Sequence, residues 1–167
     1  MAQALVSPGE RIRTLWRRLS GLPGGKWLFS RMLGYTAPYT GTMRASVVAL
    51  EPGYARVRLR DRRRVRNHLN SIHAVALANL GELTSGLAVS SLLPASARGI
   101  PVQLTVRYIK KARGTLIADC RCTLPDVTVD GEHDVTASIT DDIGDEVARA
   151  TATWRLGPVQ VGLKAWR

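Results

Sequence analysis

A single carboxylic acid, Glu82, stands in the most apolar stretch of the chain. Between residues 72 and 91 the side chains are mostly Ala, Leu and Val, and nothing interrupts a helix until Pro94. Such a helix is apolar nearly all round, so we expect it to be buried, with Asn70 or Ser71 as its N-cap. An unpaired carboxylate there costs several kcal/mol unless a hydrogen bond or a raised pKa relieves it. It suits general-base or nucleophilic chemistry, although a structural ion pair with an arginine would also explain it.

Polar side chains precede this helix at Asn67, His68, Asn70 and His73. The nine residues from His73 to Glu82 correspond to about 900° of helix and roughly 13.5 Å, which puts the two side chains on opposite faces. One helix cannot bring both to one substrate, whereas two antiparallel copies related by a two-fold axis can. We therefore expect a homodimer at least, and a dimer of dimers stays open. Asn67 as a simple turn residue and His73 as a helix cap are the structural alternatives.

Small residues recur along the same helix in steps of four, three and four, at Ala74, Ala78, Gly81 and Ser85. They form a stripe down one face. A second helix or a thin extended ligand could lie close against such a stripe.

The polar residues and their spacing resemble a known signature. Asn67, then His73-Ala74, then Glu82 nine residues after the histidine is similar to the Asn…His-Gly-Gly…Leu-Ala-Asp motif of hotdog-fold acyl-CoA thioesterases of the phenylacetate-pathway type. Residues 102–114 resemble the strand that follows the helix in that family and ends in Arg-Pro-Ala and a glycine. The chain departs from the motif at Ala74-Val75, which replaces Gly-Gly, and at Lys111, which replaces the proline. The likeness covers roughly residues 41–157, and the whole chain resembles a poorly characterised branch of these proteins.

The resemblance implies an α+β hotdog fold, an antiparallel sheet of about five to six strands wrapped around one long central helix. It also implies hydrolysis of an acyl-CoA or acyl-carrier thioester, with no cofactor apart from the coenzyme A of the substrate. Glu82 would be the base or nucleophile, and the backbone N–H of Ala74 would polarise the carbonyl oxygen. Asn67 would hold the substrate or the water, and His73 would lie near the thioester sulfur or cap the helix.

Two other classes of function stay open. One is a non-hydrolysing acyl-CoA-binding hotdog protein, and the other is a basic protein associated with a membrane surface or with nucleic acid. Hydratase relatives of this fold are not expected, because the sequence has no Asp-x-x-x-x-His pair on a loop.

The charge is strongly positive and unevenly distributed. The net charge is +11 and the pI about 10.8, yet residues 119–146 hold nine of the thirteen acids. Residues 56–66 hold seven arginines, and the last of these lead directly into Asn67. We expect the run to be either a solvated face or a site for the phosphates of coenzyme A, because arginine forks suit phosphate oxygens. The candidate phosphate ligands are Arg62, Arg63, Arg64 and Arg66. Nucleic acid is a weaker expectation, since the basic segments lack interleaved aromatic residues.

The order of the remaining elements agrees with an α+β domain. The pattern of residues 9–33 predicts two helices separated by a break. We expect this pair to cover one edge or end of a sheet, or alternatively to lie on a membrane surface. Alternating apolar residues predict two strands before the long helix and four after it. The expected strands are residues 42–50, 54–60, 102–109, 114–123, 132–141 and 146–156. We expect one domain of 167 residues, with an N-terminal helical extension (1–40), a hotdog domain (41–158) and a short tail (159–167).

No apolar run approaches the roughly 18 residues of a membrane span, and the N-terminus lacks a secretory apolar segment. The expected location is therefore the cytoplasm. Cys120 and Cys122 point to the same face of a strand, and this arrangement is too constrained for an ordinary disulfide. Even together with His133, the two cysteines are too few ligands for us to expect a metal site.

Overall fold

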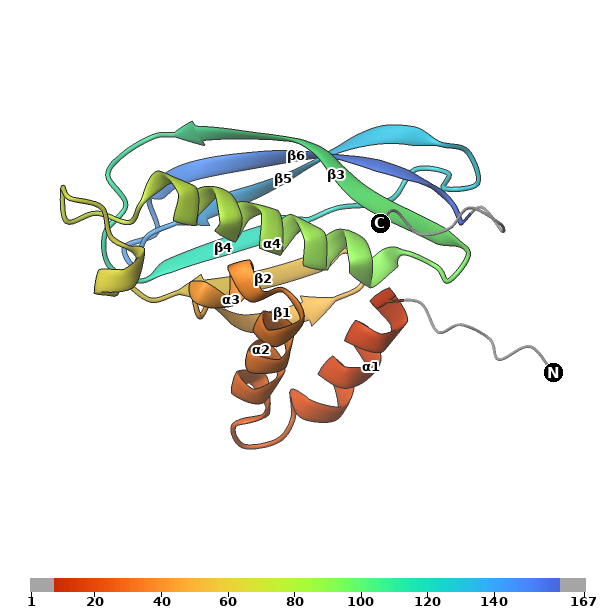
Figure 1. The fold of residues 1–167 in the computed structure, drawn as a ribbon, viewed down its shortest axis with the longest axis horizontal. Coiled ribbons are helices and arrows are strands. Elements are labelled where there is room, and N and C mark those ends of the chain that lie inside the picture. Colours follow the sequence, from red (N-terminus) through yellow and green to blue (C-terminus); the bar gives the residue numbers. More distant parts are fainter. Residues whose placement is uncertain (1–7, 160–167) are drawn as a thin grey trace.

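Helices and a single sheet make up the part of the chain that the computed structural model describes, residues 8–159. Three short helices come first, two strands follow, and one long helix precedes the last four strands (Figure 1). The elements are α1 (Pro8–Leu19), α2 (Gly25–Thr36), α3 (Pro38–Thr42), β1 (Ser46–Glu51), β2 (Tyr54–Leu59), the 3-10 turn η1 (Arg63–Val65), α4 (Ala74–Leu92), β3 (Ala97–Tyr108), β4 (Leu116–Arg121), β5 (Gly131–Thr140) and β6 (Glu146–Pro158).

The six strands form one sheet in the order β1-β2-β4-β5-β6-β3, and each neighbouring pair is antiparallel. Helix α4 lies lengthwise across this sheet (Figure 1). The predicted α+β class, the strand number and the hotdog arrangement are confirmed. The strand order leaves β1 at one edge and β3 at the other.

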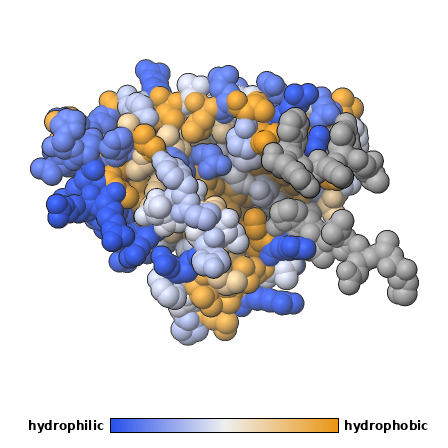
Figure 2. Space-filling model, viewed as in Figure 1, coloured by the Kyte–Doolittle hydropathy of each residue, from blue (hydrophilic) through white to orange (hydrophobic). Residues whose placement is uncertain are grey.

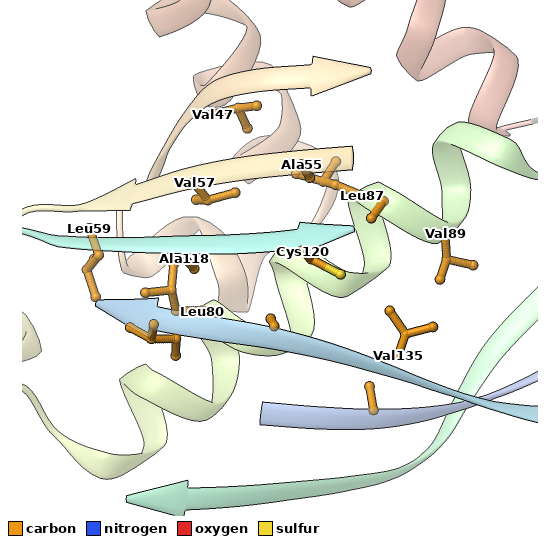
Figure 3. Close-up of a cluster of buried hydrophobic side chains, with 14 of the residues drawn as sticks. Val47, Ala55, Val57, Leu59, Leu80, Leu87, Val89, Ala118, Cys120 and Val135 are labelled. Carbon is orange, nitrogen blue, oxygen red and sulfur yellow. The ribbon is translucent and has the colours of Figure 1, made fainter. Parts of the chain in front are cut away.

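The core is the space between α4 and the sheet. On β2 the residues Ala55, Val57 and Leu59 are buried, while Arg56 between them is exposed, as period-two alternation predicts. These side chains and those of Leu80 and other α4 residues meet in one apolar cluster (Figure 3). Burying fully apolar side chains in this way is the main stabilising contribution to such a domain.

Helix α4 packs closely against the sheet at Gly81. A Cβ added to this residue would lie 2.2 Å from the Cβ of Ala150 on β6, well inside van der Waals contact. Ser85, one turn further along, is also fully buried. Two members of the small-residue stripe are therefore buried, and Gly81 lies against the protein's own sheet instead of a second helix or a ligand.

The expectation that no apolar run approaches the length of a membrane span is wrong for α4, which is long and apolar enough to cross a membrane. However, 56% of its most apolar segment is buried inside the protein. Its apolar character is explained by the sheet that covers it. It is a core helix of the fold.

Helix α2 covers the β1 edge of the sheet. The backbone N–H of Val47 donates to the hydroxyl of Ser30 at 2.9 Å, and the ammonium of Lys26 donates to the carbonyl oxygen of Val48 at 2.9 Å. Side chains thus satisfy edge groups that would otherwise be open to another strand. On the inner side, the rings of Trp16 and Phe29 meet edge to face at 5.0 Å and join the same buried cluster as Val47. The expected pair of helices over one edge is confirmed.

Two strands begin more than three residues from where they were expected. Strand β1 begins at Ser46 rather than at residue 42, because Pro38 begins the helical turn α3 and Gly41 packs against Gly34 with no room for a Cβ on either. Strand β3 begins at Ala97 rather than at residue 102. Pro101 is tolerated inside it because β3 is an edge strand and a bulge falls at this point.

Gly81→Ala should lower the free energy of unfolding by about 1–3 kcal/mol, because the added methyl group forces α4 away from β6. This loss should exceed the gain in helix propensity of about 1 kcal/mol. Urea unfolding measures the change. Gly131→Ala is the matched control, since a Cβ there meets nothing within 4 Å. A Gly81→Ala protein as stable as the control would contradict the close contact.

Candidate active site

The loop before α4 is held in place by Asp61. Its carboxylate accepts from Arg66 Nε at 2.6 Å and from the backbone N–H of Gly114 at 3.2 Å. These bonds, led by the one from Arg66, lower the pKa of the Asp61 carboxyl. Asp61 is the one acid besides Glu82 in the sequence between residues 52 and 118. Its carboxylate has a structural role and is not available to react with a substrate.

Asn67 organises the turn that enters the helix. Its side-chain oxygen accepts from the backbone N–H groups of Leu69 and Ser71, at 2.9 and 3.2 Å, and from the Ser71 hydroxyl at 3.1 Å. The backbone N–H of Asn67 in turn donates to the carbonyl oxygen of Ser71 at 2.8 Å. The oxygen of this amide is fully used, so only its NH₂ group is left to contact a ligand.

The N-cap of α4 is His73, which corrects the expectation of Asn70 or Ser71. Its Nδ1 accepts the backbone N–H of Val75 at 3.1 Å. Asn70 instead takes a left-handed conformation with φ of 52°, and Ser71 closes the turn around Asn67. Because Nδ1 is the acceptor, the proton of a neutral His73 ring is on Nε2.

Ala74 is the first residue of α4, and its backbone N–H donates to no other group in residues 8–159. The positive end of the helix dipole lies at this position. The phenol of Tyr108, on β3, donates to the carbonyl oxygen of Ala74 at 3.2 Å and ties the helix start to the edge strand. A free N–H at a helix start can stabilise a developing oxyanion.

Glu82 is half-buried in the middle of α4, and its carboxylate makes no hydrogen bond or ion pair within the described chain. Burial raises the pKa of the Glu82 carboxyl above its ordinary value of 4.5. The structural alternative of a buried ion pair with an arginine is therefore not what this chain forms. The carboxylate is free to take up a proton at a pH closer to neutrality.

Sequence reasoning missed Trp154, which lies beside Glu82. A Cβ at Gly86 would meet the Trp154 ring at 3.3 Å and the Glu82 carboxylate at 3.9 Å, so both groups flank this glycine. The indole N–H of Trp154 is buried and has no partner among the described residues. Trp154 also pairs with Pro101 of the edge strand β3. The alternating pattern of residues 146–156 predicts that Trp154 points inward, but nothing in the sequence connects it to Glu82.

Within one chain the predicted site residues lie in two places. His73, Arg64 and Arg66 line one hollow of about 830 Å³ beside α3, and Glu82 is not among its lining residues. Asn79, which the sequence analysis did not name, lines the same hollow. Glu82 and Trp154 lie on the side of α4 toward β6 and β3. The structure thus brings His73 together with arginines and leaves Glu82 apart.

The run of arginines is divided as well. Arg64 and Arg66 line the hollow that contains His73. Arg62 instead donates to the carbonyl oxygen of Arg44 at 2.8 Å and lines a different hollow. Arg63 is exposed on the turn η1. Strongly hydrophilic side chains gather over this end of the molecule (Figure 2).

The edge strand β3 is open along its length. Apolar side chains are exposed on it, among them Ile100, Val102, Leu104 and Tyr108, and within the described chain only β6 pairs with it. A long, apolar, uncovered edge is unusual in a monomeric protein.

Known proteins resemble this chain in sequence and fold. The model of a family described as Domain of unknown function (DUF4442) matches residues 25–156. The crystal structure of APC5556 superposes with a TM-score of 0.77 at 32% identity, covering 89% of this chain and 98% of that one. PA5026 from Pseudomonas aeruginosa, described as a probable thioesterase, has a TM-score of 0.72 at 23% identity and coverages of 83% and 97%. The smu.793 protein of Streptococcus mutans, crystallised with acetyl-CoA, has a TM-score of 0.59 at 25% identity and coverages of 68% and 89%. No curated protein matches the sequence.

These superpositions confirm that the chain shares the fold of these proteins, as the resemblance to hotdog-fold proteins implied.

Glu82→Gln should raise thermal stability at pH 8 and change it little at pH 4. Because the native pKa of Glu82 is raised, the native chain binds more protons than the unfolded chain from about pH 4.5 upward. Wild-type stability therefore falls as the pH rises through this window, and glutamine removes the effect. The melting temperature should rise by roughly 2–4 °C for each kcal/mol relieved. The exposed Glu132→Gln is the control, and equal melting temperatures for Glu82→Gln and wild type at pH 8 would show that the carboxylate has a partner in solution.

Proposed function

The chain belongs to the DUF4442 family, and on that premise we propose that it hydrolyses the thioester of an acyl-CoA or acyl-carrier substrate. The observation that carries the proposal is Glu82, an unpaired, half-buried carboxylate of raised pKa on the central helix of a hotdog fold. Proteins of the same fold are described as probable thioesterases, and one was crystallised with acetyl-CoA. Acyl-CoA is accordingly the substrate class we infer.

In the proposed reaction the Glu82 carboxylate takes a proton from water while the water oxygen attacks the thioester carbonyl carbon. The backbone N–H of Ala74, at the positive end of the helix, stabilises the oxyanion that forms. The C–S bond then breaks, and the coenzyme A thiolate leaves and recovers the proton. In the alternative course Glu82 attacks the carbonyl itself, and water hydrolyses the resulting anhydride.

A homodimer completes this arrangement, because Glu82 and His73 lie apart within one chain. We infer that two copies pair antiparallel through their open β3 edges, which extends the sheet and brings both α4 helices onto the same side. The partner's helix start then faces the region of Glu82 and Trp154. Dimers of these dimers are compatible with the same contact.

The other residues of the proposed site have narrower roles. The NH₂ group of Asn67 and the Nε2 of His73 are available to hold the substrate, since the opposite atom of each side chain already accepts hydrogen bonds from the chain. Arg63, Arg64 and Arg66, at the start of α4, are proposed to hold the phosphates of coenzyme A. Arg62 supports the loop through its bonds to backbone carbonyl groups and does not line the hollow that contains His73.

A second function, binding of acyl-CoA without hydrolysis, is favoured by two observations. The Asn67 oxygen is fully occupied by its own loop. Val75, which stands where the thioesterase motif has glycine, carries an exposed side chain that narrows the approach to the helix start. In that case Glu82 would contact the ligand without activating water.

Glu82→Gln should lower kcat for acyl-CoA hydrolysis about 10²–10⁴-fold, the usual effect of removing a general base. Wild-type activity should rise with pH along an acid limb above pH 4.5, because the base must be deprotonated and its pKa is raised. Thiol release from a panel of acyl-CoAs measures both effects. Glu132→Gln controls for the loss of an exposed charge. If the wild type binds acyl-CoA but releases no thiol from any member of the panel, the binding function replaces hydrolysis.

The double substitution Val102→Lys/Leu104→Lys should convert the dimer to a monomer and abolish hydrolysis, because two like-charged β3 edges repel each other. Analytical ultracentrifugation reports the mass. Ile143→Lys, an exposed apolar residue on the β5–β6 turn, is the matched control and should stay dimeric. A doubly substituted protein that remains a fully active dimer would place the interface elsewhere.

A further inference from the structure

A cationic hollow lies at the β1 edge of the sheet, between α2, α3 and strands β1 and β2. Its volume is about 910 Å³. Six positively charged side chains and no acid are among its lining residues. The six are Lys26, Arg31, Arg44, Arg58, Arg60 and Arg62.

The outward face of β2 shows that these charges are not simply a solvated surface. Arg56 is held by the Asp119 carboxylate through two bonds, at 2.9 and 3.1 Å. Arg58 and Arg60 follow on the same face, and neither forms an ion pair within residues 8–159. On this face of β2 the Asp119 carboxylate neutralises Arg56, which lies outside the hollow, and the two arginines that line the hollow have no such partner.

Two guanidinium Nε atoms in the hollow lack hydrogen-bond partners within the described chain. The Nε atoms of Arg58 and Arg62 are shielded from solvent, and no acceptor reaches either of them in the described chain. A buried donor of this kind is costly unless an acceptor is supplied. Burial, followed by the charges of Arg44 and Arg60, lowers the pKa of the Arg62 guanidinium. The hollow thus concentrates like charges and leaves N–H donors unused.

We propose that this hollow binds a phosphate group that carries two negative charges, as in a phosphomonoester or a pyrophosphate. Such a group supplies several acceptor oxygens and neutralises clustered arginines, which match it with planar forks of N–H donors. Trp27 and Tyr35 line the same hollow and are largely exposed, so the remainder of the ligand has aromatic surface to rest on. The phosphate belongs either to a soluble ester or to an anionic lipid headgroup.

The hollow adjoins the one that contains His73, because Arg31, Gly41 and Arg44 line both. Arg58 and Arg60 line only the cationic hollow, and Glu82 and Trp154 line neither. The hollow lies at β1, and the open edge β3 lies at the other end of the strand order. The ligand proposed for the hollow needs no thioester, so its binding can be tested whether or not the protein hydrolyses acyl-CoA.

Titration calorimetry of the whole protein with inorganic pyrophosphate, in a buffer free of phosphate, tests the proposal. The wild type should bind, and Arg58→Gln/Arg60→Gln should bind roughly tenfold more weakly or worse after loss of two charge-assisted contacts. Arg56→Gln, on the same face of the same strand, is the matched control and should bind like the wild type. Arg31→Gln, an exposed residue of α2, is a second variant that perturbs folding less and should also weaken binding. Equal affinities for all four proteins, or no binding to the wild type, would overturn the proposal.

Vesicle sedimentation distinguishes the two sources of the phosphate. If a lipid headgroup is the ligand, the wild type should bind phosphatidylcholine vesicles containing phosphatidic acid, pyrophosphate should compete, and Arg58→Gln/Arg60→Gln should stay in solution. If a soluble ester is the ligand, the protein should bind pyrophosphate and leave the vesicles with phosphatidic acid unbound, as it leaves vesicles of phosphatidylcholine alone. Vesicle binding that is unaffected by pyrophosphate and by the double substitution would show that the hollow is not the lipid-binding element.

Discussion

Contact between α4 and the inner face of the sheet is the constraint on which the other features depend. Gly81 brings the helix against Ala150, and the leucines of α4 fill the space beneath β2, β4 and β5. An apolar helix held so tightly cannot turn to expose a polar side chain. Glu82 therefore stays at the border between the core and the open side of the helix, where burial raises its pKa without removing it from substrate. The reactivity proposed for this carboxylate follows from helix packing.

The two edges of the sheet differ because helix α2 covers one of them and no element of the described chain covers the other. At β1, Ser30 and Lys26 of α2 bond to backbone groups of the strand, which closes that edge and creates the hollow beneath the helix. At β3 no such cover exists within the described chain, and apolar side chains are exposed. One edge is thus suited to hold a ligand and the other to hold a second copy. The N-terminal helices determine this difference, because α2 covers the β1 edge and not the β3 edge.

Unsatisfied polar groups mark both proposed sites, whereas several acids elsewhere in the described chain are held in ion pairs. The Glu82 carboxylate and the Trp154 indole N–H lie on either side of Gly86. The Nε atoms of Arg58 and Arg62 lie in the cationic hollow. By contrast, Asp61 and Asp119 each bond to an arginine. Groups left without partners at the cost of stability are the ones a ligand or substrate is expected to satisfy.

The sequence by itself determined the long helix, the six strands and the central acid, because these depend on local patterns. Alternation along β2 and the uninterrupted apolar stretch around Glu82 need no knowledge of distant segments. The spacing of Asn67, His73 and Glu82 was sufficient for the hotdog resemblance. Only the tertiary structure decided what each polar group bonds to, because the partners come from far along the chain. The Ile72 N–H donates to the Ala112 carbonyl, Gly114 donates to Asp61, and these contacts shape the turn so that His73 caps the helix. The division of the arginines between two hollows and the place of Trp154 beside Glu82 likewise arise from packing between distant elements, which no spacing along the sequence encodes.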